Sequence, residues 1–145
     1  MELLRLNVNI MAYVCEFVLL IWFFGCIVTY RIGKVLLVEG MGIKSAEFGM
    51  LVVYIASILL RVVLPQVGNW FVLAVLVFWL VVQYFCHWHF TIFGATPEKI
   101  RGYNQCFEGS LCIIPRREDR LIPDFYHIVL HILIVLNIVL LCLAL

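Results

Sequence analysis

The sequence has few charged residues for its length. Only 13% of its 145 residues are Asp, Glu, Lys or Arg, against about 25% in a typical soluble domain. This excludes a water-soluble globular protein. It also excludes a disordered one, because disorder requires high charge and low hydrophobicity. Ten basic residues are balanced by nine acidic ones, so the clustered basic face that a nucleic-acid partner requires is missing.

Common catalytic and redox motifs are missing as well. The six cysteines form no C-x-x-C pair, which argues against a thiol–disulfide enzyme and against a zinc ribbon. The chain has no G-x-S-x-G, no phosphate-binding Walker loop and no H-E-x-x-H. The sequence therefore contains no complete catalytic set.

Apolar residues, in contrast, are abundant: they make up 66% of the chain, and the mean hydropathy is +1.12. A helix needs about 20 apolar residues to cross a bilayer, and in lipid only helices of this length satisfy their own backbone groups. The first run is too long for a signal-peptide core, so we expect it to be retained. The sequence predicts one all-α integral membrane domain over residues 1–145. Its four transmembrane helices are expected at residues 9–30, 46–64, 69–93 and 125–145.

The basic residues predict the orientation of this bundle in the membrane. With four spans, both termini and a tight turn at residues 65–68 lie on one side, and connections 31–45 and 94–124 lie on the other. Lysines and arginines gather on the cytoplasmic side of membrane proteins. We therefore expect connections 31–45 and 94–124 to be cytoplasmic and the termini to lie outside. Eight basic residues fall in these connections and two fall elsewhere: Arg31, Lys34, Lys44, Lys99, Arg101, Arg116, Arg117 and Arg120 against Arg5 and Arg61.

The long connection 94–124 contains a predicted short helix. Thr96-Pro97-Glu98 combines a hydroxyl N-cap, a proline at the first helical position and an acid in the first turn. Ile100, Tyr103 and Phe107 follow at spacings of three and four, which makes one apolar face. We expect an amphipathic helix at the membrane surface. The same connection is also a candidate docking segment for a protein partner.

All four histidines of the chain fall at the expected cytoplasmic ends of the third and fourth spans. His127 and His131 are four residues apart and share a helix face. His87 and His89 are about 200° apart on a regular helix, so only one of them is expected to face inward. These four are the candidate ligand or metal residues. The candidate supporting polar residues are Gln83, Glu98, Asp124 and Tyr126.

Three interpretations of this histidine cluster are open. The residues form an interfacial hydrogen-bonding group, or a site for a transition metal or haem, or a proton-titrating gate. Imidazole is a common ligand of zinc, copper, iron and nickel, and paired histidines ligate haem. Histidine also titrates near neutral pH. The cofactor, if there is one, is not specified by the sequence.

Further polar residues occur inside the predicted spans, where each needs a partner or a function. Glu16 and Arg61 are expected to form an intramembrane ion pair; a protonatable Glu16 for ion coupling is the alternative. A lone acid in the first span is similar to the pattern of small multidrug-resistance transporters. The long third connection departs from that pattern, and no family is assigned. Asn137 is expected to serve helix packing or oligomerisation.

Three function classes therefore remain. The first is a binding or redox module centred on the histidines. The second is a small homo-oligomeric channel or proton-coupled transporter that uses Glu16 and the histidines. The third is a structural or regulatory membrane protein that docks a partner through residues 94–124.

Overall fold

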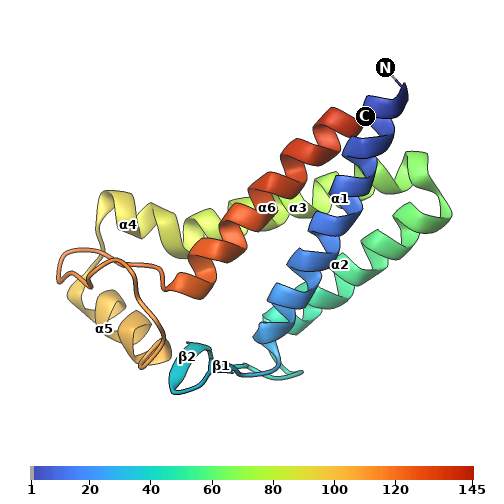
Figure 1. Ribbon diagram of the computed structural model, residues 1–145. Coiled ribbons are helices and arrows are strands. Elements are labelled where there is room, and N and C mark those ends of the chain that lie inside the picture. The colour runs from blue at the N-terminus through green and yellow to red at the C-terminus, as the bar shows by residue number, and fades with distance from the viewer. Residues whose placement is uncertain (1) are drawn as a thin grey trace.

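Four long apolar helices make up most of the protein. They are seen in a computed structural model that describes residues 2–145 (Figure 1). The chain is an all-α polytopic membrane protein, which confirms the fold class predicted from the sequence. The four segments long and apolar enough to cross a bilayer are Leu6–Cys26, Ala46–Val63, Pro65–Phe93 and Phe125–Ala144.

Shorter elements lie between and within these segments. In chain order the elements are α1 (Glu2–Phe23), the 3-10 turn η1 (Phe24–Cys26), β1 (Tyr30–Ile32), β2 (Val35–Val38), α2 (Ala46–Val63), α3 (Pro65–Gln83), the π-helical turn η2 (Tyr84–Trp88), α4 (His89–Phe93), α5 (Pro97–Cys106) and α6 (Phe125–Ala144). The first helix begins at Glu2, before the expected start at residue 9. It also ends before residue 30, because the chain after η1 leads into the β1–β2 hairpin. The α3, η2 and α4 elements follow one another without a break and form the third span.

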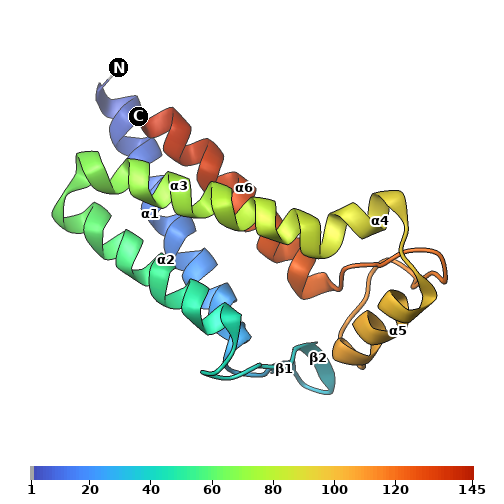
Figure 2. The same ribbon diagram turned by 180° about the vertical axis from the view of Figure 1, so that it is seen from behind.

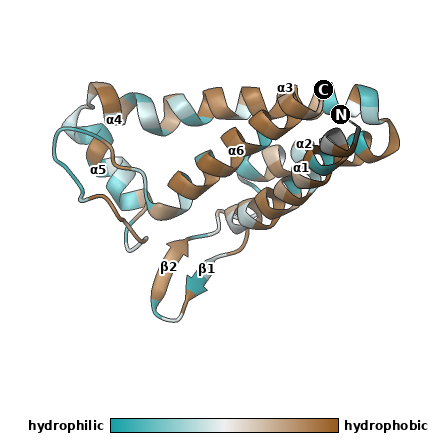
Figure 3. Ribbon diagram, turned by 45° about the horizontal axis from the view of Figure 1, so that its top comes forward, coloured by the Kyte–Doolittle hydropathy of each residue, from teal (hydrophilic) through white to brown (hydrophobic). Residues whose placement is uncertain are grey.

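The helices pack in neighbouring pairs. The α1 helix packs mainly against α6, the α2 helix against α3, and α3 also contacts α6. The two termini lie at one end of the bundle, and the hairpin and α5 lie at the other, as both views show (Figures 1 and 2). We call this second end, with the hairpin and the 94–124 connection, the loop end. Hydropathy follows the same division, since the long helices are mostly apolar and hydrophilic residues gather on α5 and the loops (Figure 3).

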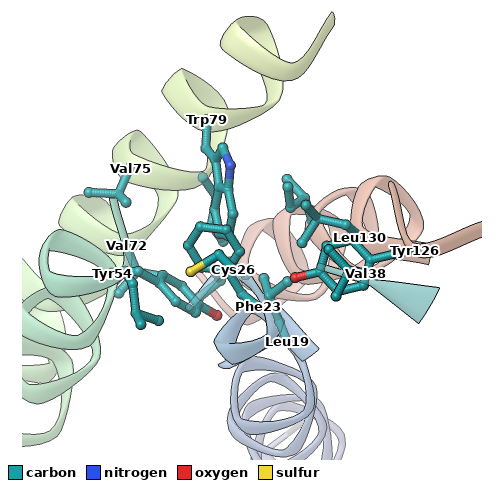
Figure 4. Close-up of a cluster of buried hydrophobic side chains, with 14 residues drawn as sticks. Leu19, Phe23, Cys26, Val38, Tyr54, Val72, Val75, Trp79, Tyr126 and Leu130 are labelled. Carbon is teal, nitrogen blue, oxygen red and sulfur yellow. The ribbon is translucent and has the colours of Figure 1, made fainter. Parts of the chain in front are cut away.

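Aromatic side chains fill the centre of the bundle. Phe23 from α1 and Tyr54 from α2 both pack on Trp79 from α3, with ring centroids 4.1 and 5.7 Å away. The close-up shows these three rings pointing toward one another (Figure 4). Tilted aromatic contacts of this kind add to the packing energy of the rings. This cluster joins three of the four spans.

The turn between α2 and α3 is tighter than the expected connection at residues 65–68. Only Leu64 separates the two helices, and Pro65 already begins α3. Proline fits this place because the first helical N–H has no intrahelical partner to lose. Gly68 then passes directly over Arg61: a Cβ at residue 68 would lie 2.1 Å from the Arg61 Cα. A side chain at residue 68 would therefore force the helices apart.

The two connections at the loop end are joined by backbone hydrogen bonds. The Leu111 N–H donates to the Leu36 carbonyl of β2 at 2.9 Å, and the Phe125 N–H donates to the Leu111 carbonyl at 2.8 Å. One strand-like segment of the 94–124 connection is thus held between the hairpin and the start of α6. The sequence pattern did not indicate this hairpin or its pairing.

The α5 helix begins where its predicted cap places it, and α6 begins after a side-chain cap of the same kind. The Thr96 hydroxyl accepts a hydrogen bond from the Lys99 N–H, and α5 begins at Pro97. The Asp124 carboxylate accepts from the His127 N–H, and α6 begins at Phe125. Each cap satisfies one of the free N–H groups of a first turn. These caps fix the positions of Tyr103 and His127, which meet at the candidate site.

Candidate functional site

Three of the four histidines meet at the loop end, between η2 and the first turns of α6. The His87 ring centroid lies 4.4 Å from that of His127 and 5.7 Å from that of His131. His87 and His131 are buried, and the His127 side chain is 12% exposed. We call these three residues the histidine site.

His89 does not join the histidine site. Its ring lies 5.9 Å from Phe85 and 5.0 Å from Phe93, which belong to its own span. Two residues apart on a helical segment, His87 and His89 point to nearly opposite sides. Of the four candidate ligands, His89 is therefore the one that the structure places apart.

The π-helical turn η2 carries His87. A π-helix is rare, usually occurs as a single turn inside an α-helix, and is often found at functional sites. Here the turn spans Tyr84–Trp88, and the Thr91 hydroxyl donates back to the His87 carbonyl at 3.1 Å. The turn changes the direction of the residues that follow it, so a regular-helix projection from the sequence is only approximate here.

Each histidine of the site uses its Nδ1 atom within the protein. His87 Nδ1 lies 2.8 Å from the Tyr103 hydroxyl on α5. His127 Nδ1 lies 2.7 Å from an Asp124 carboxylate oxygen. His131 Nδ1 donates to the His127 backbone carbonyl. The three rings are thus fixed by their Nδ1 atoms.

Two buried atoms of the surrounding polar residues have no partner in the part of the chain that the structure describes. Asp124 is 1% exposed, and one of its oxygens caps α6 while the other has no hydrogen bond. The Gln83 side-chain oxygen is also buried without a partner. Unpaired polar atoms in an apolar interior are costly, so the region has unused hydrogen-bonding capacity.

Two other predicted supporting residues use their polar groups elsewhere, although the Tyr126 ring meets that of His127 edge to face at 5.3 Å. Tyr126 stacks on Trp22 at 5.3 Å and donates its hydroxyl to the Trp22 carbonyl at 3.0 Å, so it joins α6 to α1. Glu98 is exposed in the first turn of α5. Neither side chain has a hydrogen bond to a histidine in the described part of the chain.

Tyr103 is the residue of the site that the sequence did not single out. Its spacing predicts only a place on the apolar face of α5, together with Ile100 and Phe107. In the structure Phe107 also packs on His127, with ring centroids 4.9 Å apart. Burial, reinforced by the Asp124 carboxylate, raises the pKa of Tyr103 above its usual range, so the phenol keeps its proton. The apolar spacing was the available signal, but it does not reveal a hydroxyl directed at a histidine.

The histidine site is not arranged as a metal cage. Within residues 2–145, no group of three or more His, Cys, Asp or Glu side chains has a geometry that could hold a metal ion. The His87 and His127 rings also lie directly against each other, whereas two axial haem ligands need opposite faces of a flat macrocycle. The site is better suited to hydrogen bonding than to metal coordination.

A second polar cluster lies between α1, α2 and α3. Arg61 Nη1 lies 2.5 Å from a Glu16 carboxylate oxygen, and both side chains are almost fully buried. The same guanidinium donates to Asn69 at 2.6 Å and to Asn9 at 3.3 Å, and it lies 3.9 Å above the Tyr13 ring. We call this group the arginine cluster. It lies apart from the histidine site.

Asn137 lies inside the chain's own bundle. It is fully buried, and its amide donates to the Cys15 carbonyl of α1 at 3.3 Å and to the Leu133 carbonyl at 2.8 Å. Its contacts therefore serve packing between α6 and α1.

In comparisons with family models, with curated proteins and with solved structures, the chain matches none of them.

Proposed function

We propose that this small integral membrane protein is a binding protein whose histidine site takes up the polar group of a ligand. The observation that carries the proposal is the Nε2 atom of His131. This atom is buried and has no hydrogen-bond partner among residues 2–145, and the residue is only 5% exposed.

The chemistry of that atom follows from its ring. A backbone carbonyl only accepts hydrogen bonds, and of the two carbonyls that face the ring that of His127 makes the hydrogen bond, so we assign the ring proton to His131 Nδ1. In the neutral imidazole the other nitrogen is then an acceptor with a free lone pair. The Gln83 carbonyl faces this ring, but as another acceptor it leaves the lone pair unpaired. A ligand that supplies a donor, or a metal ion, would satisfy it.

A transition-metal ion is the second candidate ligand. Histidines that bind metals usually engage their other ring nitrogen with a carboxylate, a carbonyl or a similar partner, and all three histidines here do so. The absence of a suitable three-residue group among the described side chains weighs against this candidate. Metal analysis of protein purified without a histidine tag separates the two candidates, since a stoichiometric metal lost in His127→Ala/His131→Ala would favour coordination.

The transporter and oligomer hypotheses have less support. Glu16 is the residue that a proton-coupled mechanism would use, and one of its carboxylate oxygens is held by Arg61. A pore would have to form between copies, because the side chains of the four helices fill the bundle centre. A defined oligomer with flux in liposomes that depends on Glu16 would revive this hypothesis.

The orientation of the site in the membrane remains part of the proposal. We place the loop end, with the histidine site, in the cytoplasm, because eight of the ten basic residues belong to residues 31–45 and 94–124. A cytoplasmic protein partner at α5 would then lie next to the bound ligand. Labelling of single cysteines introduced at residues 34 and 117 in sealed cells would test this placement.

Histidine nitrogen NMR tests the binding proposal directly. In the protein labelled with ¹⁵N-histidine and reconstituted in nanodiscs, we expect His131 to be the Nδ1-protonated tautomer, with Nε2 as acceptor. Native mass spectrometry of protein taken from its own membrane should show a bound species that is lost in His131→Phe and kept in His89→Phe. A doubly protonated His131 and no bound species would overturn the proposal.

A further inference from the structure

An apolar groove runs along the outside of the bundle above His131. It lies between the α3–η2 segment and α6, which lie side by side near the loop end (Figure 2). Its volume is about 840 Å³, and its lining is almost entirely apolar. Small-molecule sites have about 300–1,000 Å³ and a similar lining, with a few polar groups that orient the ligand. The apolar walls of the groove include Leu80, Val81, Phe85, Val135, Leu136 and Val139.

His131 lies at one end of this groove, together with Trp88. The two rings meet edge to face, with centroids 5.6 Å apart. Because the third and fourth spans run in opposite directions, Leu80 and Val139 mark the other end, which is deeper in the membrane. Eight helical residues separate His131 from Val139, so the groove is about 12 Å long at 1.5 Å per residue. The groove therefore has a histidine at its loop end and apolar walls over a length that suits a hydrocarbon chain.

We propose that this groove binds a single-chain lipid alcohol, whose hydroxyl donates to His131 Nε2 and whose hydrocarbon chain lies along the groove toward Val139. This inference rests on the binding function proposed above and names the class of ligand. It follows from the need to satisfy one buried acceptor at the loop end of an otherwise apolar groove.

The chemistry of the groove disfavours charged lipid headgroups. An ionised carboxylate or phosphate diester offers no donor to a neutral Nε2. An ammonium group offers a donor, but burying its charge among apolar walls without a counter-charge is costly. A hydroxyl supplies the donor without charge. Because the rim residues Phe85, Ile132 and Leu136 are exposed, such a ligand can enter sideways from the lipid.

The experiment uses the full chain in phosphatidylcholine nanodiscs, with 1-decanol as the probe. Two signals are followed during the titration: the His131 Nε2 nitrogen shift, which reports the hydroxyl, and the Val135 methyl shift, which reports the chain. We expect both to saturate with the same midpoint. The Val53 methyl, exposed on α2 away from the groove, reports unspecific partition into lipid and should not saturate.

Variants and a second probe make the test decisive. His131→Phe should raise the midpoint seen at the Val135 methyl at least tenfold, and n-decane should bind the wild type at least tenfold more weakly than 1-decanol. Val139→Trp fills the deeper end of the groove, two helical turns away from the histidine, and should abolish saturation at the Val135 methyl. His89→Phe is the matched control and should bind like the wild type.

Three results would overturn the inference. They are equal midpoints for 1-decanol and n-decane, unchanged binding in both groove variants, and efficient cross-linking of Val135→Cys between copies, which would place a second protein in the groove. If 1-decanol fails while His131 keeps its free Nε2 and another species co-purifies, the ligand class is wrong and the binding function stands. If His131 is doubly protonated and nothing is bound, both are wrong.

Discussion

The arginine cluster and the histidine site are two polar groups inside one apolar bundle, and they differ in how well they are satisfied. In the arginine cluster, Arg61 has hydrogen bonds to three side chains and a ring beneath its guanidinium, and only one oxygen of Glu16 has no partner. The histidine site and the polar residues around it leave one atom each of Gln83, Asp124 and His131 buried without a partner, counted over residues 2–145.

We take this difference to separate a structural role from the proposed binding role. A polar group in the membrane is costly and persists only where it stabilises the bundle or serves a function. The arginine cluster holds three spans together with its own side chains. The histidine site is held through its Nδ1 atoms and keeps acceptors free, which is the arrangement a ligand requires.

The largest expected effect comes from breaking the arginine cluster. Arg61→Met leaves the Glu16 carboxylate buried without its cation, and we expect a loss of about 3–5 kcal/mol in the free energy of unfolding. Unfolding in mixed micelles, followed by tryptophan fluorescence, measures it. The double variant Glu16→Leu/Arg61→Met removes both charges and should recover most of the loss. A single variant as stable as the wild type would remove the structural role.

Adding a side chain at residue 68, where α3 passes over Arg61, should have the next largest effect. In Gly68→Ala the new methyl would overlap the Arg61 backbone, and relieving such overpacking costs about 1–3 kcal/mol. Gly49 on α2 is the matched control, because a Cβ there meets nothing within 4 Å. Gly49→Ala should therefore be neutral or stabilising, since alanine favours helix. Equal stability of the two variants, from the same micelle unfolding, would contradict the close approach.

A smaller effect is expected at the histidine site. Tyr103→Phe removes the hydroxyl next to His87 Nδ1 and should cost about 1 kcal/mol. The population of undocked α5 would then rise roughly fivefold. Tryptic cleavage at Lys99 and Arg101 in nanodiscs measures that population. Tyr84→Phe is the control, because the Tyr84 hydroxyl has no hydrogen bond among the described residues. Equal cleavage rates in both variants would show that Tyr103 does not hold α5.

The smallest effect is expected at the exposed ion pairs of the 94–124 connection. Hydrogen bonds from Arg120 and then Arg117 lower the pKa of Asp119 below its usual value. A lowered pKa stabilises the folded state above the unfolded-state pKa, and this contribution is lost as the pH falls through the folded value. Because Asp119 is exposed, the change in stability should be smaller than in the other three variants. Carboxyl NMR should show its titration midpoint move up in Arg120→Ala and stay fixed in Arg31→Ala.

Much of the fold follows from the sequence because the strongest signals are long and local. The four apolar runs, the N-cap at Thr96 and the N-cap at Asp124 each depend on neighbouring residues. The hairpin at Tyr30–Val38 is short and pairs partly with Leu111, far away in the sequence, so no local pattern reveals it. The single-residue turn at Leu64 depends on the contact of Gly68 with Arg61. This is a contact between two helices, which no local sequence pattern reveals.

The candidate site was predictable in its place but not in its chemistry. The positions of His87, His127 and His131 in two spans are enough to bring them to one end of the bundle. Their ring orientations depend on the π-helical turn and on Tyr103, which belong to the packed structure. The free nitrogen of His131 and the groove beside it appear only when α3 and α6 are placed together.

The backbone bonds at Leu111 have a consequence for how the molecule could be divided. They connect the hairpin after the first span to the start of the last span, and we call these bonds the junction. The exposed residues 114–118 form a loop that takes no part in it, which we call the bypass. A protease cut in this bypass would leave α6 bound to the remainder through the junction and through its contacts with α1. Two separately expressed pieces, residues 1–115 and 116–145, should consequently reassemble into one particle.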